Sequence, residues 1–401
     1  MPKLLQINIT ANWGSTGKIA ESIGIAAMSA GWESYIAYGR WCNPSQSNLI
    51  KVGGRWNKYL HYAEQLICDN EGLCSRKATK KLIKQIEDIK PDVVQLHNIH
   101  DHYLNYKILF EYFNQTDINV VWSFHDCWAF TGHCFHFVTK ECIKWKTQCF
   151  ECPMQYVLPK TLVDKSKEHY ELKKRLFGSC KNLTIVSVSD WMAGFVKQSF
   201  MKNKQTRIIK NGVDLNVFKP VARIRDGKIR ILGVSGVWHK DKGLYDFYKL
   251  RDLLDDERYE IVMVGLNEKQ LRNLPTGIKG FNHTESIQEL VELYSSASVF
   301  VNPTYADTFP TVNLEALACG TPVITYNTGG SPEAISVDTG WVVEQGNVPA
   351  IASIITSFVS KKENEIITQR KACRKRAEKE FDKNKCFEKY LQLYEDILTK
   401  R

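Results

Sequence analysis

The 401-residue chain lacks any apolar run near the ~18–20 residues that a membrane-spanning helix needs. No long apolar stretch follows a basic start in residues 1–13, so we expect no secretory signal. The chain also lacks low-complexity tracts, internal repeats and coiled-coil heptads. These absences favour a cytoplasmic protein, either soluble or held peripherally at the inner face of the membrane.

Acidic residues are in the minority, because 54 Lys and Arg against 44 Asp and Glu give a formal net charge of +10. Helix-turn-helix, zinc-finger and RNA-binding signatures are absent, so we do not expect nucleic acid as a partner. The positive excess is either ordinary solubility charge or an indication of an anionic substrate or an anionic membrane face. Many of the lysines lie in 77–90 and 165–175, both with helical spacing.

The length of the chain exceeds what one ordinary core accommodates, so we expect two domains. Short apolar strands alternate with amphipathic helices in two series, which is typical of parallel sheets covered on both faces. A charged segment at 221–228 separates the series and reads as a linker. Strands are expected at 4–9, 92–97, 119–124, 183–188 and 207–209, and then at 229–234, 259–265, 299–302 and 322–326.

This α/β pattern predicts a doubly wound domain over 1–205 and a second over 206–382, with a C-terminal helix, 383–401, returning to the first. Ligands of open parallel sheets bind beyond the carboxyl ends of the strands. Two sheets that face each other would therefore share a central cleft.

Residues 302–330, NPTYADTFPTVNLEALACGTPVITYNTGG, are the most informative segment. Asp307 precedes the start of an expected helix, where the backbone N–H groups of Thr311 and Val312 suit a phosphate. Glu315, one to two turns further, can reach the hydroxyls of a ribose. By itself, this spacing also describes a capped turn followed by a solvated glutamate.

The segment resembles the family 4 glycosyltransferases, which have the GT-B fold of two Rossmann-like domains. Their E-x7-E-A-x-A-x-G-x-P-V-I pattern is matched by Asp307 and by Glu315-Ala-Leu-Ala-Cys-Gly-Thr-Pro-Val-Ile324, with Asp in place of the first Glu. The resemblance implies that Asp307 lies near the donor sugar and that Glu315 binds the donor ribose. It also implies a retaining transfer from a UDP- or GDP-sugar to a saccharide or lipid-linked saccharide, with no cofactor for catalysis.

Two further features bear on this resemblance. Asn211-Gly-Val-Asp-Leu-Asn-Val-Phe218 resembles the family's N-G-[VI]-D-x-x-x-F stretch. Many relatives also carry G-R-x-x-x-x-K-G, whose two cations hold the pyrophosphate. Here Lys242 is retained but Val237 stands at the Arg position. Since a departing diphosphate needs positive charge, Lys240 is our candidate for the second cation, and two solvated lysines are the alternative.

In the first half, Gly14-Ser-Thr-Gly17-Lys18 lacks the spacing of a Walker loop. The resemblance implies instead a glycine loop that approaches the donor phosphates through Gly14 and Gly17. His125 stands at a strand end where family members have a His that faces the transferred sugar. It therefore joins Asp307 and Lys242 as an expected catalytic residue, and a buried structural histidine is the alternative. His97 and His100 are secondary candidates on the acceptor side.

Five of the twelve cysteines lie between residues 127 and 152, and such a cluster favours a metal site over a disulfide framework. Four of them form C-x7-C-x6-C-x2-C and predict structural zinc, with His133, His136 or Cys127 able to replace a ligand. Two disulfides or free thiols are the alternative. The four are Cys134, Cys142, Cys149 and Cys152.

The stretch 125–134, HDCWAFTGHC, resembles a subset of family 4 enzymes that assemble polysaccharides. It implies a role in capsule, exopolysaccharide or lipopolysaccharide synthesis. Two alternatives to a transferase stay open from the residues alone. An epimerase on the same fold would turn over the nucleotide-sugar without an acceptor, and a non-catalytic protein would bind the nucleotide-sugar without releasing the nucleotide.

Overall fold

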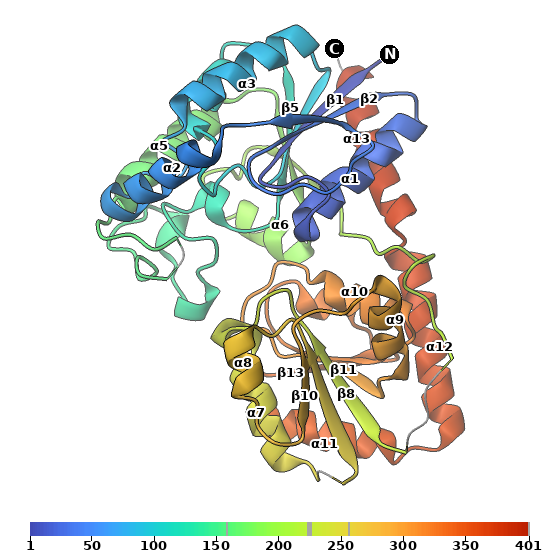
Figure 1. Ribbon diagram of the computed structural model, residues 1–401. Helices are drawn as coiled ribbons and strands as arrows, with labels where there is room; N and C mark the ends of the chain where they lie inside the picture. Colours follow the sequence, from blue (N-terminus) through green and yellow to red (C-terminus); the bar gives the residue numbers. More distant parts are fainter. Residues whose placement is uncertain (158, 223–226, 256, 400–401) are drawn as a thin grey trace. The chain divides into compact units, whose positions relative to one another are not determined.

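The computed structural model describes residues 1–157, 159–222, 227–255 and 257–399, which form two compact units (Figure 1). Unit 1 comprises residues 1–210 together with the C-terminal segment from Phe387, and unit 2 comprises Asn211–Cys386. Residues 223–226 of the expected linker and residues 400–401 of the expected last helix lie outside the described ranges.

Unit 1 is built on a parallel sheet whose described strands have the order β3-β2-β1-β4-β5-β6-β7. In the register, Leu5 of β1 lies opposite both Tyr35 and Val94. The strands β4, β5 and β6 are buried along their whole length, as expected for a sheet covered on both faces. The strand bounds are β1 Lys3–Asn8, β2 Glu33–Tyr38, β3 Asn48–Lys51, β4 Val93–Leu96, β5 Asn119–Phe124, β6 Leu183–Ser187 and β7 Gln205–Ile208.

The helices of unit 1 cover this sheet and enclose an aromatic core in which Phe110, Trp122 and Phe177 contact one another. The last helix, α13 (Lys383–Thr399), contacts the sheet through a hydrogen bond of 3.0 Å that the Tyr394 hydroxyl donates to the Gln95 side chain. The other helices are α1 Gly14–Ser29, α2 Arg55–Cys68, α3 Arg76–Ile89, α4 Tyr106–Phe113, α5 Ser166–Ser179 and α6 Asp190–Val196.

The glycine segment after β1 differs from the expected loop. Helix α1 begins at Gly14, so Gly14 and Gly17 lie in its first turn. At Gly17, a Cβ atom would lie only 2.6 Å from the Thr10 Oγ1 atom and 3.3 Å from the Asn12 nitrogen. The second glycine therefore lets the chain after β1 cross close over the helix.

Unit 2 repeats the arrangement with a parallel sheet whose described strands have the order β10-β9-β8-β11-β12-β13. Its strands are β8 Ile229–Val234, β9 Tyr259–Val264, β10 Ile278–Phe281, β11 Val299–Asn302, β12 Val323–Tyr326 and β13 Gly340–Val343. Its helices are α7 Leu244–Leu253, α8 Glu268–Arg272, α9 Ile287–Ser296, α10 Thr311–Ala318, α11 Val348–Val359 and α12 Glu363–Glu380. Two Rossmann-like sheets confirm the predicted fold class.

None of the helices in the described part of the chain combines the length and the apolar character required to cross a bilayer.

Candidate functional site

In unit 2, the loops that follow β8, β11 and β12 are held together at the carboxyl end of the sheet. Gly243 has a φ of +76°, and a Cβ atom there would lie 2.3 Å from the Pro303 carbonyl oxygen. Gly329 has a φ of +57°, and its Cβ would lie 1.7 Å from the Asp307 carbonyl oxygen. Because glycine alone permits both the conformation and the approach, these two positions fix the spacing of the loops.

An ion pair joins two of these loops, with the Lys242 Nζ atom 2.6 Å from the Asp307 Oδ2 atom. The two side chains keep 28% and 23% of their surface exposed. A pair with this much contact with water contributes at most ~1 kcal/mol to stability, so a ligand can displace either partner. The structure thus brings together two of the residues predicted to be catalytic.

Glu315 lies in the second turn of α10, where its Oε2 atom accepts a hydrogen bond of 2.9 Å from the Tyr294 hydroxyl. Burial and the Glu315 carboxylate raise the pKa of Tyr294 well above its usual value, so the phenol stays a donor. Tyr294 was not identified from the sequence, because an aromatic residue in α9 carries no motif. This hydrogen bond orients the carboxylate that the family pattern assigns to the ribose.

The start of α10 presents backbone donors to solvent. Its N-cap is Pro310, which has no side-chain acceptor, and Thr311 and Val312 are half-buried in the first turn. The N–H groups of a first helical turn have no partner within the helix and carry partial positive charge. Thr311 and Val312 therefore lie where the sequence predicted a phosphate site.

The second predicted cation is placed differently from the first. Lys240 begins a short 3-10 helix, Lys240–Lys242, and its side chain is exposed. Among the described contacts, Asp307 pairs with Lys242 and not with Lys240. Val237, at the family's Arg position, is 67% exposed. The role of Lys240 as the second cation stays a prediction.

In unit 1, the carboxyl ends of β4 and β5 bring His97 and His125 into contact. The His97 Nδ1 and His125 Nε2 atoms lie 3.0 Å apart, and the rings stack at a centroid distance of 5.3 Å. His97 also bonds Gln6 of β1 through its Nε2 atom at 3.1 Å. Burial lowers the pKa of His125 to about 4 and that of His97 well below its usual value. Both imidazoles are neutral at pH 7 and suit an uncharged hydroxyl.

A charged network beside this pair joins His100, a secondary candidate from the sequence, to carboxylates that sequence reasoning missed. The His100 Nε2 atom is 2.8 Å from the Asp126 Oδ2 atom. Although burial raises the pKa of Asp126, the neighbouring His100 brings it down to about 2. His102 bonds Glu71 at 3.2 Å; burial lowers its pKa, but Asp101 and Glu71 raise it to about 9. Two His–Asp dipeptides, His100-Asp101 and His125-Asp126, were the signal in the sequence for this network.

The start of α1 belongs to the same sheet edge. Asn8, at the end of β1, donates to the Thr16 hydroxyl at 3.3 Å and accepts from the Asn98 nitrogen at 3.2 Å. The segment that contains Gly14 and Gly17 thus lies next to the strand end that carries His97. The structure gathers the predicted unit 1 residues, and donor binding by the two glycines stays a prediction.

The four predicted zinc ligands line one small, mostly apolar pocket together with Phe137, Trp145 and Met154. A hydrogen bond from the Cys134 thiol lowers the pKa of Cys152 to about 7. None of the twelve cysteines forms a disulfide, and the described residues contain no group of three or more His, Cys, Asp or Glu side chains arranged to hold a metal ion. His133 bonds Asp69 at 3.0 Å and the Pro159 carbonyl at 2.6 Å, so both ring nitrogens are engaged.

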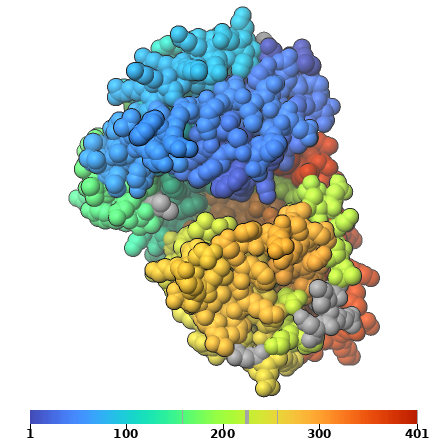
Figure 2. Space-filling model, in the orientation of Figure 1, coloured from blue at the N-terminus to red at the C-terminus, as the bar shows by residue number. Residues whose placement is uncertain are grey.

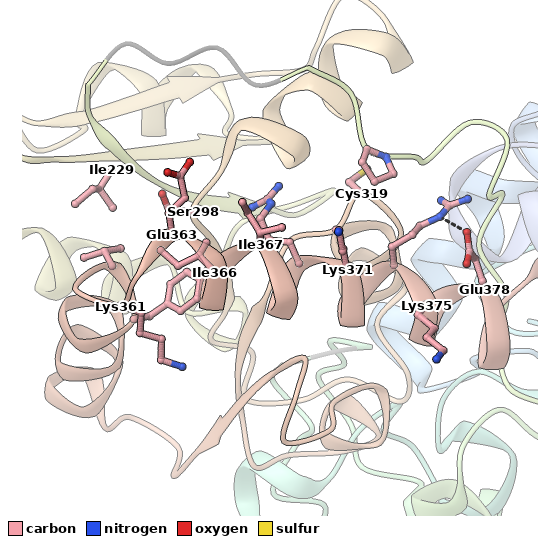
Figure 3. Close-up of a pocket in the computed structure, with 16 residues that line it drawn as sticks. Ile229, Ser298, Cys319, Lys361, Glu363, Ile366, Ile367, Lys371, Lys375 and Glu378 are labelled. Atoms are coloured by element: carbon pink, nitrogen blue, oxygen red, sulfur yellow. Dashed lines mark hydrogen bonds and ion pairs between the residues drawn. The ribbon is translucent and has the colours of Figure 1, made fainter.

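Unit 2 also contains a cavity of about 870 Å³, whose lining does not include Lys242, Asp307 or Glu315. Figure 3 shows Ile229 and Ser298, at the amino ends of β8 and β11, above the α12 side chains Ile366, Ile367 and Lys371. Lys242 and Asp307 follow the carboxyl ends of the same strands. Size alone therefore does not locate the donor site.

Comparison with protein families divides the chain between two models. The model described as "Glycosyltransferase Family 4" matches residues 28–217, and the model described as "Glycosyl transferases group 1" matches residues 218–380. The second match contains Lys242, Asp307 and Glu315. It therefore covers the residues around which the loops of unit 2 converge.

Curated relatives carry glycosyltransferase names. The putative colanic acid biosynthesis glycosyl transferase WcaC of Escherichia coli (strain K12) is 22% identical over 365 residues, 86% of this chain and 88% of that protein. The sulfoquinovosyl transferase SQD2 of Arabidopsis thaliana is 31% identical over 193 residues, 44% of this chain and 37% of that protein.

Solved structures share the fold. Sucrose-phosphate synthase from Thermosynechococcus elongatus superposes with a TM-score of 0.76 at 17% identity, covering 100% of both chains. WaaG, a glycosyltransferase involved in lipopolysaccharide biosynthesis, gives a TM-score of 0.67 at 13% identity, covering 98% of this chain and 99% of that one. These likenesses identify the fold of the two Rossmann-like units as GT-B.

Proposed function

This chain belongs to the family 4 glycosyltransferases, and from that premise we propose that it transfers a sugar from a UDP- or GDP-sugar, with retention of configuration. The acceptor is a saccharide or a lipid-linked saccharide in capsule, exopolysaccharide or lipopolysaccharide synthesis. Support for this setting comes from the names of WcaC and of the Staphylococcus aureus capsular polysaccharide biosynthesis glycosyltransferase CapM, which is 26% identical over 178 residues.

The observation that carries the proposal is the grouping in unit 2 of the Lys242–Asp307 pair with the start of α10. A diphosphate at this helix start attracts Lys242 away from Asp307, because two phosphate charges outweigh one carboxylate. Asp307 is then released to accept hydrogen bonds from the donor sugar. Glu315, held by Tyr294, accepts from the ribose hydroxyls.

In the reaction, the bond between the anomeric carbon and the phosphate oxygen breaks, and a bond from the acceptor oxygen to that carbon forms on the same face. The acceptor proton moves to the departing phosphate oxygen. Lys242 and the α10 N–H groups stabilise the negative charge that develops on the leaving diphosphate. We assign the neutral His125 a hydrogen bond to the transferred sugar, with His97 fixing its ring orientation.

The test is a panel of UDP-, GDP- and ADP-sugars, assayed for nucleotide release with and without a lipid-linked saccharide extract. We expect acceptor-dependent release from one donor, lost in Glu315→Gln and retained in Glu292→Gln. Glu292 is an exposed carboxylate on α9 and is the matched control. Release that ignores the acceptor would indicate an epimerase or hydrolase, and binding without release would indicate a non-catalytic protein.

We further propose that Cys134, Cys142, Cys149 and Cys152 bind structural zinc. The support is that the four cysteines line one small pocket. Thiolates are the ligands that structural zinc prefers. Elemental analysis should find zinc in the purified protein and in Cys180→Ser, a buried cysteine outside the pocket, but not in Cys149→Ser. Zinc-free wild-type protein would refute this assignment.

A further inference from the structure

Helix α2 of unit 1 is inverted relative to an ordinary surface helix. Its fully buried side chains are the polar His61 and Gln65. Its apolar side chains point to solvent, with Trp56 80% exposed, Leu60 65% and Ile67 58%. A surface helix normally turns its apolar stripe toward the core and its polar face to water. Exposed apolar area gathered on one element indicates an interaction surface.

The buried polar face fixes this orientation. The His61 Nε2 atom accepts from the Gly72 nitrogen at 3.1 Å, and its Nδ1 atom bonds the Ser75 hydroxyl at 2.7 Å. The Gln65 Oε1 atom bonds the His102 Nε2 atom at 3.1 Å. Rotating α2 to bury Trp56 would leave these buried polar groups without partners, at a cost of ~1–3 kcal/mol each. The apolar face therefore stays outward.

The apolar surface continues beyond the helix. Leu162 is 60% exposed and Val163 43%, and the Leu162 nitrogen donates to the Leu66 carbonyl at 2.8 Å. The Thr161 hydroxyl donates to the Gln65 carbonyl at 3.1 Å. The segment after the cysteine cluster is thus bonded to the C-terminal half of α2 and adds to the same exposed face.

Positive charge flanks this face. The next helix, α3, is linked to α2 through Ser75, which bonds both Asn57 and His61. Residues 76–84 of α3 include five exposed cations, whereas two of the three acidic residues between 55 and 84, Asp69 and Glu71, are buried. Both helices lie at the surface of unit 1 (Figures 1 and 2). The five cations are Arg76, Lys77, Lys80, Lys81 and Lys84.

We propose that α2, with the adjoining 161–163 segment and residues 76–84 of α3, is a docking surface for an anionic lipid bilayer. Exposed Trp, Tyr and Leu side chains beside lysines match the chemistry of the membrane interface, where rings enter the headgroup layer and cations meet anionic lipid. The anionic headgroups of such a bilayer supply the counter-charge for the five α3 cations.

This surface is bonded directly to the strand-end network of unit 1. His102, which holds Gln65 of α2, also bonds Glu71, and Glu71 accepts from the Asp101 backbone. Asp101 and His102 directly follow His100 in the chain. Docking by α2 would therefore present the acceptor side of unit 1 to lipid-linked saccharides. This consequence rests on the proposed function, whereas lipid binding itself does not.

The experiment is flotation of the full chain with phosphatidylglycerol vesicles and, as the uncharged arm, phosphatidylcholine vesicles. Trp56→Ser combined with Leu60→Ser should weaken binding to phosphatidylglycerol by about tenfold or more, because each side chain loses its burial in the interface. The matched control combines Ile287→Ser with Val337→Ser, two apolar residues of unit 2 that are 48% and 89% exposed.

The charge arm replaces Lys80 and Lys81 with Gln, which should weaken binding about fivefold per lysine at low salt. Lys181→Gln with Lys202→Gln removes the same charge from exposed positions elsewhere in unit 1 and should have little effect.

Wild-type protein that does not float with phosphatidylglycerol, or that floats equally with phosphatidylcholine, would overturn the proposal. So would wild-type protein that is dimeric in solution and becomes monomeric in the Trp56/Leu60 variant, because the face would then be an interface between copies. Nucleotide release with a water-soluble acceptor, measured on the same variants, reports the transferase function separately. This release should be unchanged in the Trp56/Leu60 and the Lys80/Lys81 double variants.

Discussion

The two units share one fold and differ in the chemistry at the carboxyl ends of their strands. Both sheets are parallel, and in each the first strand of the unit lies in the middle between its second and fourth strands. Unit 1 places two neutral imidazoles, His97 and His125, at its strand ends. Unit 2 places the Lys242–Asp307 ion pair and the carboxylate of Glu315 there. The fold provides the position, and the side chains provide the function.

Desolvation contributes to this difference. His97 is buried and His125 is half-buried at the ends of β4 and β5, and desolvation lowers the pKa of both imidazoles. Lys242 and Asp307 keep part of their surface in water and form an ion pair. A neutral site suits sugar hydroxyls, and a charged, accessible site suits a diphosphate.

The largest effect is expected from removing the cation of unit 2. Lys242→Met should lower kcat for nucleotide release by about 10²–10³-fold, because one preorganised charge on the leaving group is lost. Steady-state kinetics with the identified donor measures this, with the exposed Lys269→Met on α8 as the control. If Lys242→Met lowers kcat no more than Lys269→Met does, Lys242 has no role in catalysis. The proposed contrast between a charged site in unit 2 and a neutral site in unit 1 would then be wrong.

A smaller effect is expected in the neutral site. His125→Asn should lower kcat about 10–100-fold, since a hydrogen bond and not a charge is lost. Because the folded-state pKa of His125 is about 4, its neutral form prevails above that value. The wild-type rate should therefore show no step near pH 6.5 from this group. A step at that pH that disappears in His125→Asn would show that the imidazole titrates normally and is not buried in the working enzyme.

Tyr294→Phe sharpens the comparison within unit 2. The substitution removes the hydrogen bond to Glu315 and leaves the carboxylate in place. Hydrogen bonds to charged groups contribute ~1.5–3 kcal/mol, so about a tenfold rise in KM for the donor is expected, with a smaller change in kcat. Tyr248→Phe, on α7, is the control. An unchanged KM would mean that Glu315 needs no orienting partner.

Substitution of one glycine in each unit compares how tightly the loops of the two units pack. Gly17→Ala meets the Thr10 side chain, which can shift, and should cost about 1–3 kcal/mol in the free energy of unfolding. Gly329→Ala meets the Asp307 backbone oxygen at a φ of +57°, so a larger cost is expected. Urea unfolding of both variants measures which substitution lowers the free energy of unfolding more. The reverse order would place the tighter loop packing in unit 1.

The inner strands were predictable because continuous apolar runs mark them, and those at 119–124, 229–234 and 299–302 were predicted to the residue. The edge strands β3, β10 and β13, and β2 beside an edge, were not predicted, since their exposed or half-buried positions break the apolar run. The first turn of α1 was predicted as a loop, because Gly14 and Gly17 read as loop residues, whereas Gly17 in fact serves close packing.

Asp307, Glu315 and Lys242 were identified from motif spacing, which local sequence carries. Tyr294, Gln6 and Asp126 gain their roles from partners brought close only by the fold, so no window of sequence reveals them.

By itself, the sequence determined the two alternating series of strands and helices and the enzyme family, and it predicted the principal residues of the candidate donor site, since each depends on local pattern. The tertiary structure decided which imidazoles are neutral and which face of α2 is exposed. Both depend on desolvation and on hydrogen-bond partners that lie far along the chain, such as Gln6 for His97 and His102 for Gln65.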